Sequence, residues 1–151
     1  MSLRAVAYVS EAVEGIGGAD IDRILADAAA HNRMAGVTSV LMFDGVRFLQ
    51  YLEGPDDGMR SVYPRVLNAR SHHQLRELAQ GEVPTRQFPR WTMASARIEA
   101  QVLSDIAETP WDGFTAAAPV TGERRIGFAR LLELWTGVSG ELEPAALSLG
   151  S

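Results

Sequence analysis

Three polar side chains, Tyr8, Asn32 and Gln50, stand within apolar segments of the 151-residue sequence. If Val46–Leu52 is a strand, alternation places Gln50 on the same face as Phe48. A buried amide without partners costs about 1 to 3 kcal/mol, so a hydrogen-bonding group should lie on that face. A phenol and two amides among apolar neighbours would suit a flat heteroaromatic ligand whose edge both donates and accepts hydrogen bonds.

Each of the three residues also has a purely structural explanation. Tyr8 could be a core residue with a satisfied hydroxyl, Asn32 could cap a helix end, and Gln50 could bond to the backbone. Their expected coincidence in one layer is what favours a ligand site.

The hydropathy pattern predicts the elements that bring these residues together. Strands are expected over Leu3–Ser10, Val37–Phe43, Val46–Leu52, Leu75–Glu82 and Trp91–Glu99, and helices from Asp20 to near Gly36 and from Pro55 to about Asn68. Asp20 is expected to be an N-cap, Pro55 to lie in the first turn of its helix, and Asp44-Gly45 to form a type I′ turn. The order β-α-β-β-α-β-β predicts an α+β fold: an antiparallel-rich sheet with two helices on one face and a cleft between them.

The remaining residues are expected to form a helical appendage. A short helix is predicted over Gln101–Glu108, a loop over Trp111–Gly122 and an amphipathic helix over Glu123–Thr136. The predicted organisation is a main domain over residues 1–98, an appendage over 99–137 and a flexible tail over 138–151.

Composition argues against several classes of protein. The net charge of −5 leaves no basic stripe for nucleic acid or a membrane surface, and an acidic chain is a poor RNA-binding module. Zero cysteines exclude disulfides and thiolate sites, and without a secretory signal or an apolar run of about 20 residues we expect a cytoplasmic protein. His72-His73 lacks convincing partners for a metal, and the Gly15–Gly18 turn lacks the lysine and spacing of a phosphate-binding loop.

Four sequence segments are specific enough to indicate a family. They are Ala7–Ser10, His31-Asn32 followed by Gly36–Thr38, Phe48–Gly54, and Arg86–Met93. Together they resemble the BLUF family of blue-light sensors using flavin, over Leu3 to about Ile98, and residues 101–135 resemble the C-terminal helices of short stand-alone members. The resemblance implies a ferredoxin-like fold that holds the isoalloxazine ring of FAD between two helices, with FMN or riboflavin as alternatives.

The resemblance also implies a role for individual residues. Gln50 is the switching amide beside flavin N5 and O4, Tyr8 is the photochemical electron donor, and Asn32 bonds the pyrimidine edge. Trp91 and Met93 match a pair whose inward or outward placement relative to Gln50 is open. The other residues implied to contact the cofactor are Ile24, Ala28 and Val66 around the ring, and His31, Leu41, Phe48, Arg65, Arg70 and His72.

The chain departs from the family pattern at Ser39, where glycine is usual, and at Ala69 and Ser71, where an Asp and an Arg usually flank Arg70. The loss of that charged pair puts cofactor affinity in doubt.

The expected function is a non-enzymatic photoreceptor that signals to a downstream protein or its own homo-oligomer. Its relay is expected to be an outer face bearing Leu49, Tyr51 and Thr92 together with the C-terminal helix. The alternatives are a light-insensitive interaction module and a flavin-dependent reductase.

Overall fold

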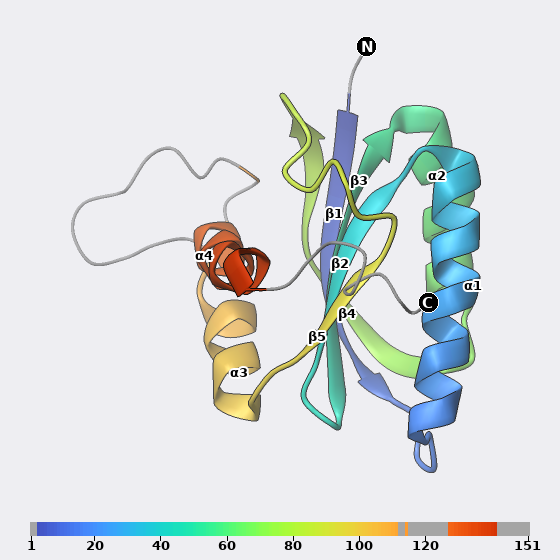
Figure 1. Ribbon diagram of the computed structural model, residues 1–151, viewed down its shortest axis with the longest axis vertical. Helices are drawn as coiled ribbons and strands as arrows, with labels where there is room; N and C mark the ends of the chain where they lie inside the picture. The colour runs from blue at the N-terminus through green and yellow to red at the C-terminus, as the bar shows by residue number, and fades with distance from the viewer. Residues whose placement is uncertain (1–2, 112–113, 115–126, 142–151) are drawn as a thin grey trace, which may run out of the picture.

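The protein consists of a five-stranded sheet between two helical layers (Figure 1). The computed structural model describes residues 3–111, Phe114 and 127–141. The strands are β1 (Leu3–Ala12), β2 (Thr38–Phe43), β3 (Arg47–Pro55), β4 (His72–Val83) and β5 (Ala94–Arg97). The helices are α1 (Gly18–Ala35), α2 (Asp56–Leu67), α3 (Ala100–Glu108) and α4 (Gly127–Glu141). The predicted α+β class and β-α-β-β-α-β-β order are confirmed, and the architecture is consistent with a ferredoxin-like fold.

The strand order in the sheet is β4-β1-β3-β2-β5. All neighbours are antiparallel except β2 and β5, which run parallel. In the β1–β3 ladder Tyr8 lies directly opposite Gln50. Two residues far apart in the sequence are therefore placed side by side by backbone pairing alone.

Side chains on the central strands alternate between two differently packed faces. Val6, Tyr8 and Leu52 face α1 and α2, together with Met59 and Val62 of α2. On the other face, the sheet packs against α3 and α4 in one cluster that includes Ala7, Leu49, Tyr51, Leu103, Phe128, Leu131 and Trp135. The predicted face assignment is confirmed, because a shift of one residue would exchange the two sets.

Helix α1 begins two residues before the predicted cap. Gly17 is the N-cap, and Asp20 lies in the first turn, where its Oδ2 accepts the Gly17 N–H at 2.9 Å. The expectation that Asp20 is itself the cap was wrong, because an acidic side chain at the third helical position can reach back to that N–H. At the other end, Gly36 has a φ of 73°, a left-handed conformation that ends the helix where the sequence predicted.

The β2–β3 turn is displaced by one residue from the predicted Asp44-Gly45 turn. Gly45 has a φ of 104°, whereas neither Asp44 nor Val46 has a positive φ. A type I′ turn needs positive φ at both central residues, so a Gly45-Val46 turn of the II′ kind fits instead. The Asp44 carboxylate stabilises it by accepting the N–H groups of Val46 at 2.9 Å and Arg47 at 2.7 Å.

The last predicted strand, Trp91–Glu99, is shortened to Ala94–Arg97. Parallel pairing with β2 starts only at Val40 and Ala94. The preceding Thr92 carbonyl is instead bound by side chains, those of Asn32 and Ser39, so it is unavailable to a strand ladder. Other boundaries also differ from those predicted: β1 runs to Ala12, β3 runs to Pro55, β4 extends over His72–Val83, and Pro55 is the N-cap of α2.

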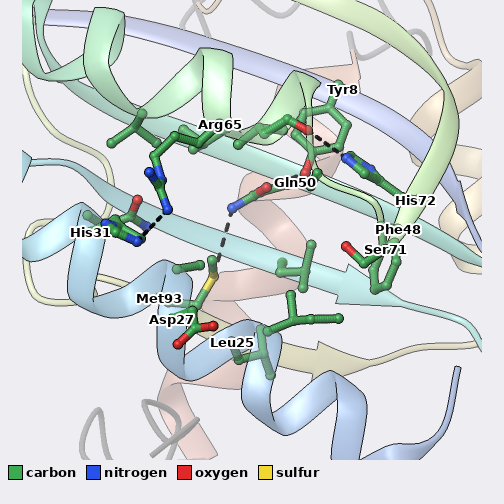
Figure 2. Close-up of a pocket in the computed structure, with 18 of the residues that line it drawn as sticks. Tyr8, Leu25, Asp27, His31, Phe48, Gln50, Arg65, Ser71, His72 and Met93 are labelled. Atoms are coloured by element: carbon green, nitrogen blue, oxygen red, sulfur yellow. Dashed lines mark hydrogen bonds between the residues drawn. The ribbon is translucent and has the colours of Figure 1, made fainter.

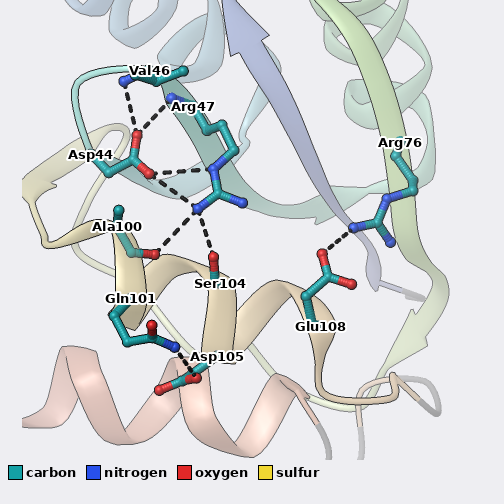
Figure 3. Close-up of polar contacts among 9 residues, drawn as sticks. All are labelled: Asp44, Val46, Arg47, Arg76, Ala100, Gln101, Ser104, Asp105 and Glu108. Carbon is teal, nitrogen blue, oxygen red and sulfur yellow. Dashed lines mark hydrogen bonds and ion pairs between the residues drawn. The ribbon is translucent and has the colours of Figure 1, made fainter.

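Arginine side chains attach α3 to the sheet (Figure 3). Arg47 Nη2 donates to the Ala100 carbonyl at 3.2 Å and to Ser104 Oγ at 2.8 Å, and Arg76 pairs with Glu108 at 2.8 Å. Helix α3 matches its prediction within one residue. Helix α4 reaches Glu141, so it overlaps the predicted tail, while the predicted helix start at 123 and residues 142–151 lie outside the described residues.

The outer face expected to carry the relay is not open. Leu49 and Tyr51 are completely buried beneath the C-terminal helices, and Thr92 is half-buried. A partner therefore cannot reach Leu49 and Tyr51 while α3 and α4 are in place.

In the part of the chain that the structure describes, no helix is both long and apolar enough to cross a membrane.

Candidate functional site

A cavity of about 600 Å³ opens between α1, α2 and the sheet (Figure 2). Its volume is within the range of roughly 300 to 1,000 Å³ that is usual for small-molecule sites. The residues predicted to bind a cofactor that line it are Tyr8, Ile24, Ala28, His31, Asn32, Leu41, Phe48, Gln50, Arg65, Val66 and His72. Met93 also lines it. Arg70 does not, and its side chain is exposed.

Tyr8 and Gln50 form the central polar pair of this cavity. The Tyr8 hydroxyl donates to Gln50 Oε1, and both side chains are buried. Burial, aided by the nearby Tyr63, raises the pKa of Tyr8 above its usual value, so the hydroxyl is protonated and able to donate at neutral pH. Gln50 Nε2 faces Met93 Sδ at 3.8 Å. A thioether is a weak acceptor, so this amide end remains able to take a stronger one.

The orientation of the Asn32 amide is fixed by its surroundings. Asn32 Nδ2 donates to the Thr92 carbonyl at 2.7 Å and to Ser39 Oγ at 3.1 Å, and the residue is 1% exposed. A carbonyl can only accept, so Nδ2 must be the atom that faces Thr92. Both amide hydrogens have partners, which leaves Oδ1 as the acceptor for a ligand. A donor from Gln50 and an acceptor from Asn32 would suit a planar ligand edge on which an N–H lies next to a carbonyl.

His72 forms the cavity wall beside Tyr8. Its Nε2 lies 2.8 Å from the Val66 carbonyl and its Nδ1 lies 2.6 Å from Ser10 Oγ. Because the carbonyl only accepts, Nε2 carries a hydrogen, and Nδ1 forms a hydrogen bond with the Ser10 hydroxyl. The His72 and Tyr8 ring centroids are 5.7 Å apart. Among the described residues, no group of three side chains of metal-ligating type comes together.

His31 and Arg65 link the two helices across the cavity. Arg65 Nη2 donates to His31 Nε2 at 2.6 Å, and Figure 2 shows the two side chains facing each other. The helices also meet at Gly58 in the first turn of α2. A Cβ there would lie 2.1 Å from the Ala35 carbonyl oxygen, so only glycine permits this close approach.

Met93 and Trp91 point to opposite faces of the sheet. Met93 is 4% exposed and lines the cavity, whereas Trp91 belongs to the cluster on the α3 and α4 side. There Trp91 packs against Phe88 and Trp135, with ring centroids 5.9 and 5.5 Å away. The question that the sequence left open is answered in this structure, with methionine inward and tryptophan outward.

Several cavity residues were not anticipated from the sequence. They are Leu25, Asp27, Leu52, Val62, Pro64, Asn68, Ala69 and Ser71. Asp27 could have been found, because it precedes His31 by four residues and so shares its helix face. Ala69 and Ser71 had been singled out only as departures from a family pattern. Their position shows that these departures lie in the cavity wall.

Comparison with known proteins identifies the family. The sequence pattern of BLUF, described as sensors of blue-light using FAD, matches residues 3–94. This chain belongs to the BLUF family. It is 27% identical over 124 residues to the blue light- and temperature-regulated antirepressor BluF of Escherichia coli (strain K12), covering 82% of this chain and 31% of that protein. The BLUF chain thus spans less than a third of the length of that relative.

Solved structures share the same BLUF fold. The ground state of BlsA matches with a TM-score of 0.65 at 18% identity, covering 95% of this chain and 90% of that one. The dark state of the BLUF protein BlrB matches with a TM-score of 0.60 at 24% identity, covering 70% and 79% of the two chains. The agreement with BlsA extends beyond the family pattern and so includes the C-terminal helical layer.

Proposed function

We propose that this BLUF chain is a blue-light photoreceptor that binds a flavin in the cavity between α1 and α2. The observation that carries the proposal is the bond from Tyr8 to Gln50 in the same cavity as the oriented amide of Asn32. Apolar side chains would contact the two faces of the ring: Ile24 and Ala28 from α1, and Val66 from α2.

Light sensing requires that a brief change at Tyr8 leaves a lasting change at Gln50. A bound flavin supplies the absorption of blue light and an excited state that accepts an electron. Tyr8, the hydrogen-bond partner of Gln50, would supply an electron and its hydroxyl proton to a flavin held there and would take both back. Gln50 would rotate or tautomerise during this exchange. An amide suits the role because its donor and acceptor ends are nearly equal in size, so reversal needs little repacking.

We propose FAD as the flavin, with FMN and riboflavin as alternatives. Arg65 and His72 line the cavity and would contact the ring edge and the side chain of the cofactor, and His31 lines it as a further contact. Arg70 lies outside the wall but follows Ala69 within it, so we propose that Arg70 contacts the part of the cofactor extending beyond the cavity.

The dark-minus-light absorption spectrum of the purified protein tests this proposal. We expect a yellow protein with a reversible red shift of the flavin band, and chromatography of the acid-released cofactor should identify FAD. A colourless protein that cannot be reconstituted with any flavin would contradict the proposal and favour a light-insensitive module. Bleaching of the bound flavin by NADH would favour the reductase instead.

We further propose that the chain acts through protein contacts rather than by catalysis. The Escherichia coli relative is named as an antirepressor, which is a role exerted on another protein. The output would pass either to a downstream partner or to a second copy of this chain. Light scattering coupled to size-exclusion chromatography, in darkness and under blue light, would show whether the association state changes.

A further inference from the structure

Ser39 lies behind the cavity wall, where it contacts three groups on two neighbouring elements. Its side chain is completely buried. Ser39 Oγ lies 3.1 Å from Asn32 Nδ2, 3.1 Å from the Thr92 carbonyl oxygen and 3.3 Å from Met93 Sδ. One hydroxyl therefore contacts the amide proposed to hold the ligand edge and the segment that leads into β5.

The hydrogen-bonding capacity of Ser39 makes this contact adjustable. Ser39 Oγ accepts from Asn32 and has a single hydrogen to donate, but two acceptors, Thr92 O and Met93 Sδ, are within reach. Met93 Sδ is also the atom that faces Gln50 Nε2. If Gln50 reverses and its acceptor end meets the sulfur, the sulfur loses its amide donor. The Ser39 hydrogen can then shift toward Met93 and away from Thr92.

The Ser39 backbone is also bonded to a residue whose side chain lies on the opposite face of the sheet. The Ser39 N–H donates to the Trp91 carbonyl at 2.9 Å, and the Trp91 ring packs against Trp135 of α4. Trp91 and Thr92 share a peptide unit, whose carbonyl belongs to Trp91, and the next carbonyl is that of Thr92. Ser39 thus holds two consecutive carbonyls, one through its backbone and one through its hydroxyl.

We propose that Ser39 is a positioning residue that couples Gln50 and Met93 in the cavity to Trp91 on the α4 side. The coupling rests on the proposed light response, because it needs a change at Gln50. Ser39 does not line the cavity, and without its hydroxyl Asn32 keeps the shorter bond to the Thr92 carbonyl. The Ser39 hydroxyl should therefore affect transmission rather than flavin binding or the red shift.

Fluorine NMR of the full chain labelled with 5-fluorotryptophan tests the coupling. The Trp91 resonance is assigned by its disappearance in Trp91→Phe and recorded in darkness and under blue light. We expect a light-induced shift of this resonance in the unmodified protein. In Ser39→Ala and Ser39→Gly we expect the shift to fall to half or less, while the red shift of the flavin band persists.

The two variants separate the hydroxyl from packing, because both lack the hydroxyl but only Ser39→Ala keeps the Cβ. A loss seen in glycine alone would overturn the proposal, as would an unchanged Trp91 shift in both variants. An unmodified protein with a red shift but no Trp91 response would also overturn it. If Ser39→Ala does not fold, Ser39→Cys, which has a weaker donor, should show a partial loss.

Ser104→Ala is the matched control, since it removes a hydroxyl on α3 that accepts from Arg47 of β3 and should change neither signal. Absence of flavin or of any red shift in the unmodified protein has a different meaning. It would contradict the proposed function itself and the coupling that depends on it.

Discussion

The two faces of the sheet use the same residue type for different purposes. Tyr8 and Tyr51 lie on the adjacent strands β1 and β3, and both are buried. The Tyr8 hydroxyl donates to the Gln50 amide, whereas the Tyr51 hydroxyl donates to the Glu53 carboxylate at 2.7 Å. An amide can present either a donor or an acceptor, but an ionised carboxylate only accepts. The partner therefore decides whether a buried tyrosine can take part in a switch or serves as a fixed support.

The environment of Glu53 explains why the α3 and α4 face is the fixed one. Glu53 is completely buried, and its oxygens accept the N–H groups of Gln87 at 2.8 Å and Phe88 at 2.7 Å, besides the Thr38 hydroxyl at 3.4 Å. Burial, and then the charge and hydrogen bond of Glu53, raise the pKa of Tyr51 well above its usual value. These bonds attach the segment before Trp91 to β3.

The largest expected difference is between the two tyrosines themselves. Tyr8→Phe should abolish the light-induced red shift while some flavin remains bound, because the photochemical donor is lost. Gln50→Ala should do the same. Tyr51→Phe should keep the red shift and lower the free energy of unfolding by about 1 to 2 kcal/mol, because Glu53 loses one donor. Difference spectra of all three variants measure the red shift, and urea titrations measure the free energy of unfolding. Loss of the red shift in Tyr51→Phe would contradict the distinction between Tyr8 and Tyr51.

Truncation of Trp135 should produce the largest loss of stability on the α4 side. Trp135 is 1% exposed and contacts the rings of Trp91 and Phe88. Trp135→Ala should lower the free energy of unfolding by about 3 to 5 kcal/mol. Leu67→Ala, at a residue that is 51% exposed on α2, is the control and should change it by less than about 0.5 kcal/mol. Equal effects of the two variants would show that α4 contributes little to the core.

Replacing Glu53 should weaken the fixed face without removing the switch. In Glu53→Gln one end of the amide presents N–H groups to backbone donors, which should cost about 1 to 3 kcal/mol. Urea unfolding followed by circular dichroism measures this loss, with the exposed Glu14→Gln as control. A stability equal to that of the unmodified protein would mean that the 87–88 segment is held by other contacts.

The smallest effect concerns the Asp44 carboxylate at the β2–β3 turn. Burial acts to raise its pKa, but the N–H groups of Arg47 and Val46 and the Arg47 guanidinium hold that pKa below the usual value. The folded state therefore binds the proton less readily than the unfolded state. The resulting stability is present above the unfolded pKa of about 4 and is lost as pH falls through the folded value.

Asp44→Asn should accordingly lower the free energy of unfolding by about 1 kcal/mol at pH 7, and by progressively less below about pH 4. Unfolding titrations of the unmodified protein and Asp44→Asn between pH 7 and pH 2.5 measure how the difference in their free energies of unfolding changes. A difference that stays constant over this range would contradict the prediction. The red shift at pH 7 should be unchanged, because Asp44 lies outside the cavity.

Alternation along the strands predicted that Tyr8 and Gln50 face the helices, because one residue of slip would bury these polar groups in the aromatic cluster. Asn32 joins them from the last turn of α1, as expected, whereas most other cavity residues were named only through the family resemblance. Turn and strand limits were less accurate. The Trp91–Glu99 strand was predicted too long because its pattern gives no sign that Asn32 and Ser39 bind the Thr92 carbonyl.

The role of Glu53 also lay beyond sequence reasoning. Its main donors are backbone N–H groups 34 and 35 residues later in the chain, and every residue except proline carries such a group. Residue types therefore give no signal for this contact. The same limit applies to the bond between Ser39 N–H and the Trp91 carbonyl.

The direct pairing of Tyr8 with Gln50 across β1 and β3 has a practical consequence for folding studies. These strands are neighbours inside the sheet, with β4 and β2 paired outside them, so fraying at either sheet edge leaves the pair intact. The photoresponse would then report locally on the β1–β3 ladder, without any added label. During denaturant titration its amplitude should disappear with the central sheet, later than any probe placed on an edge strand.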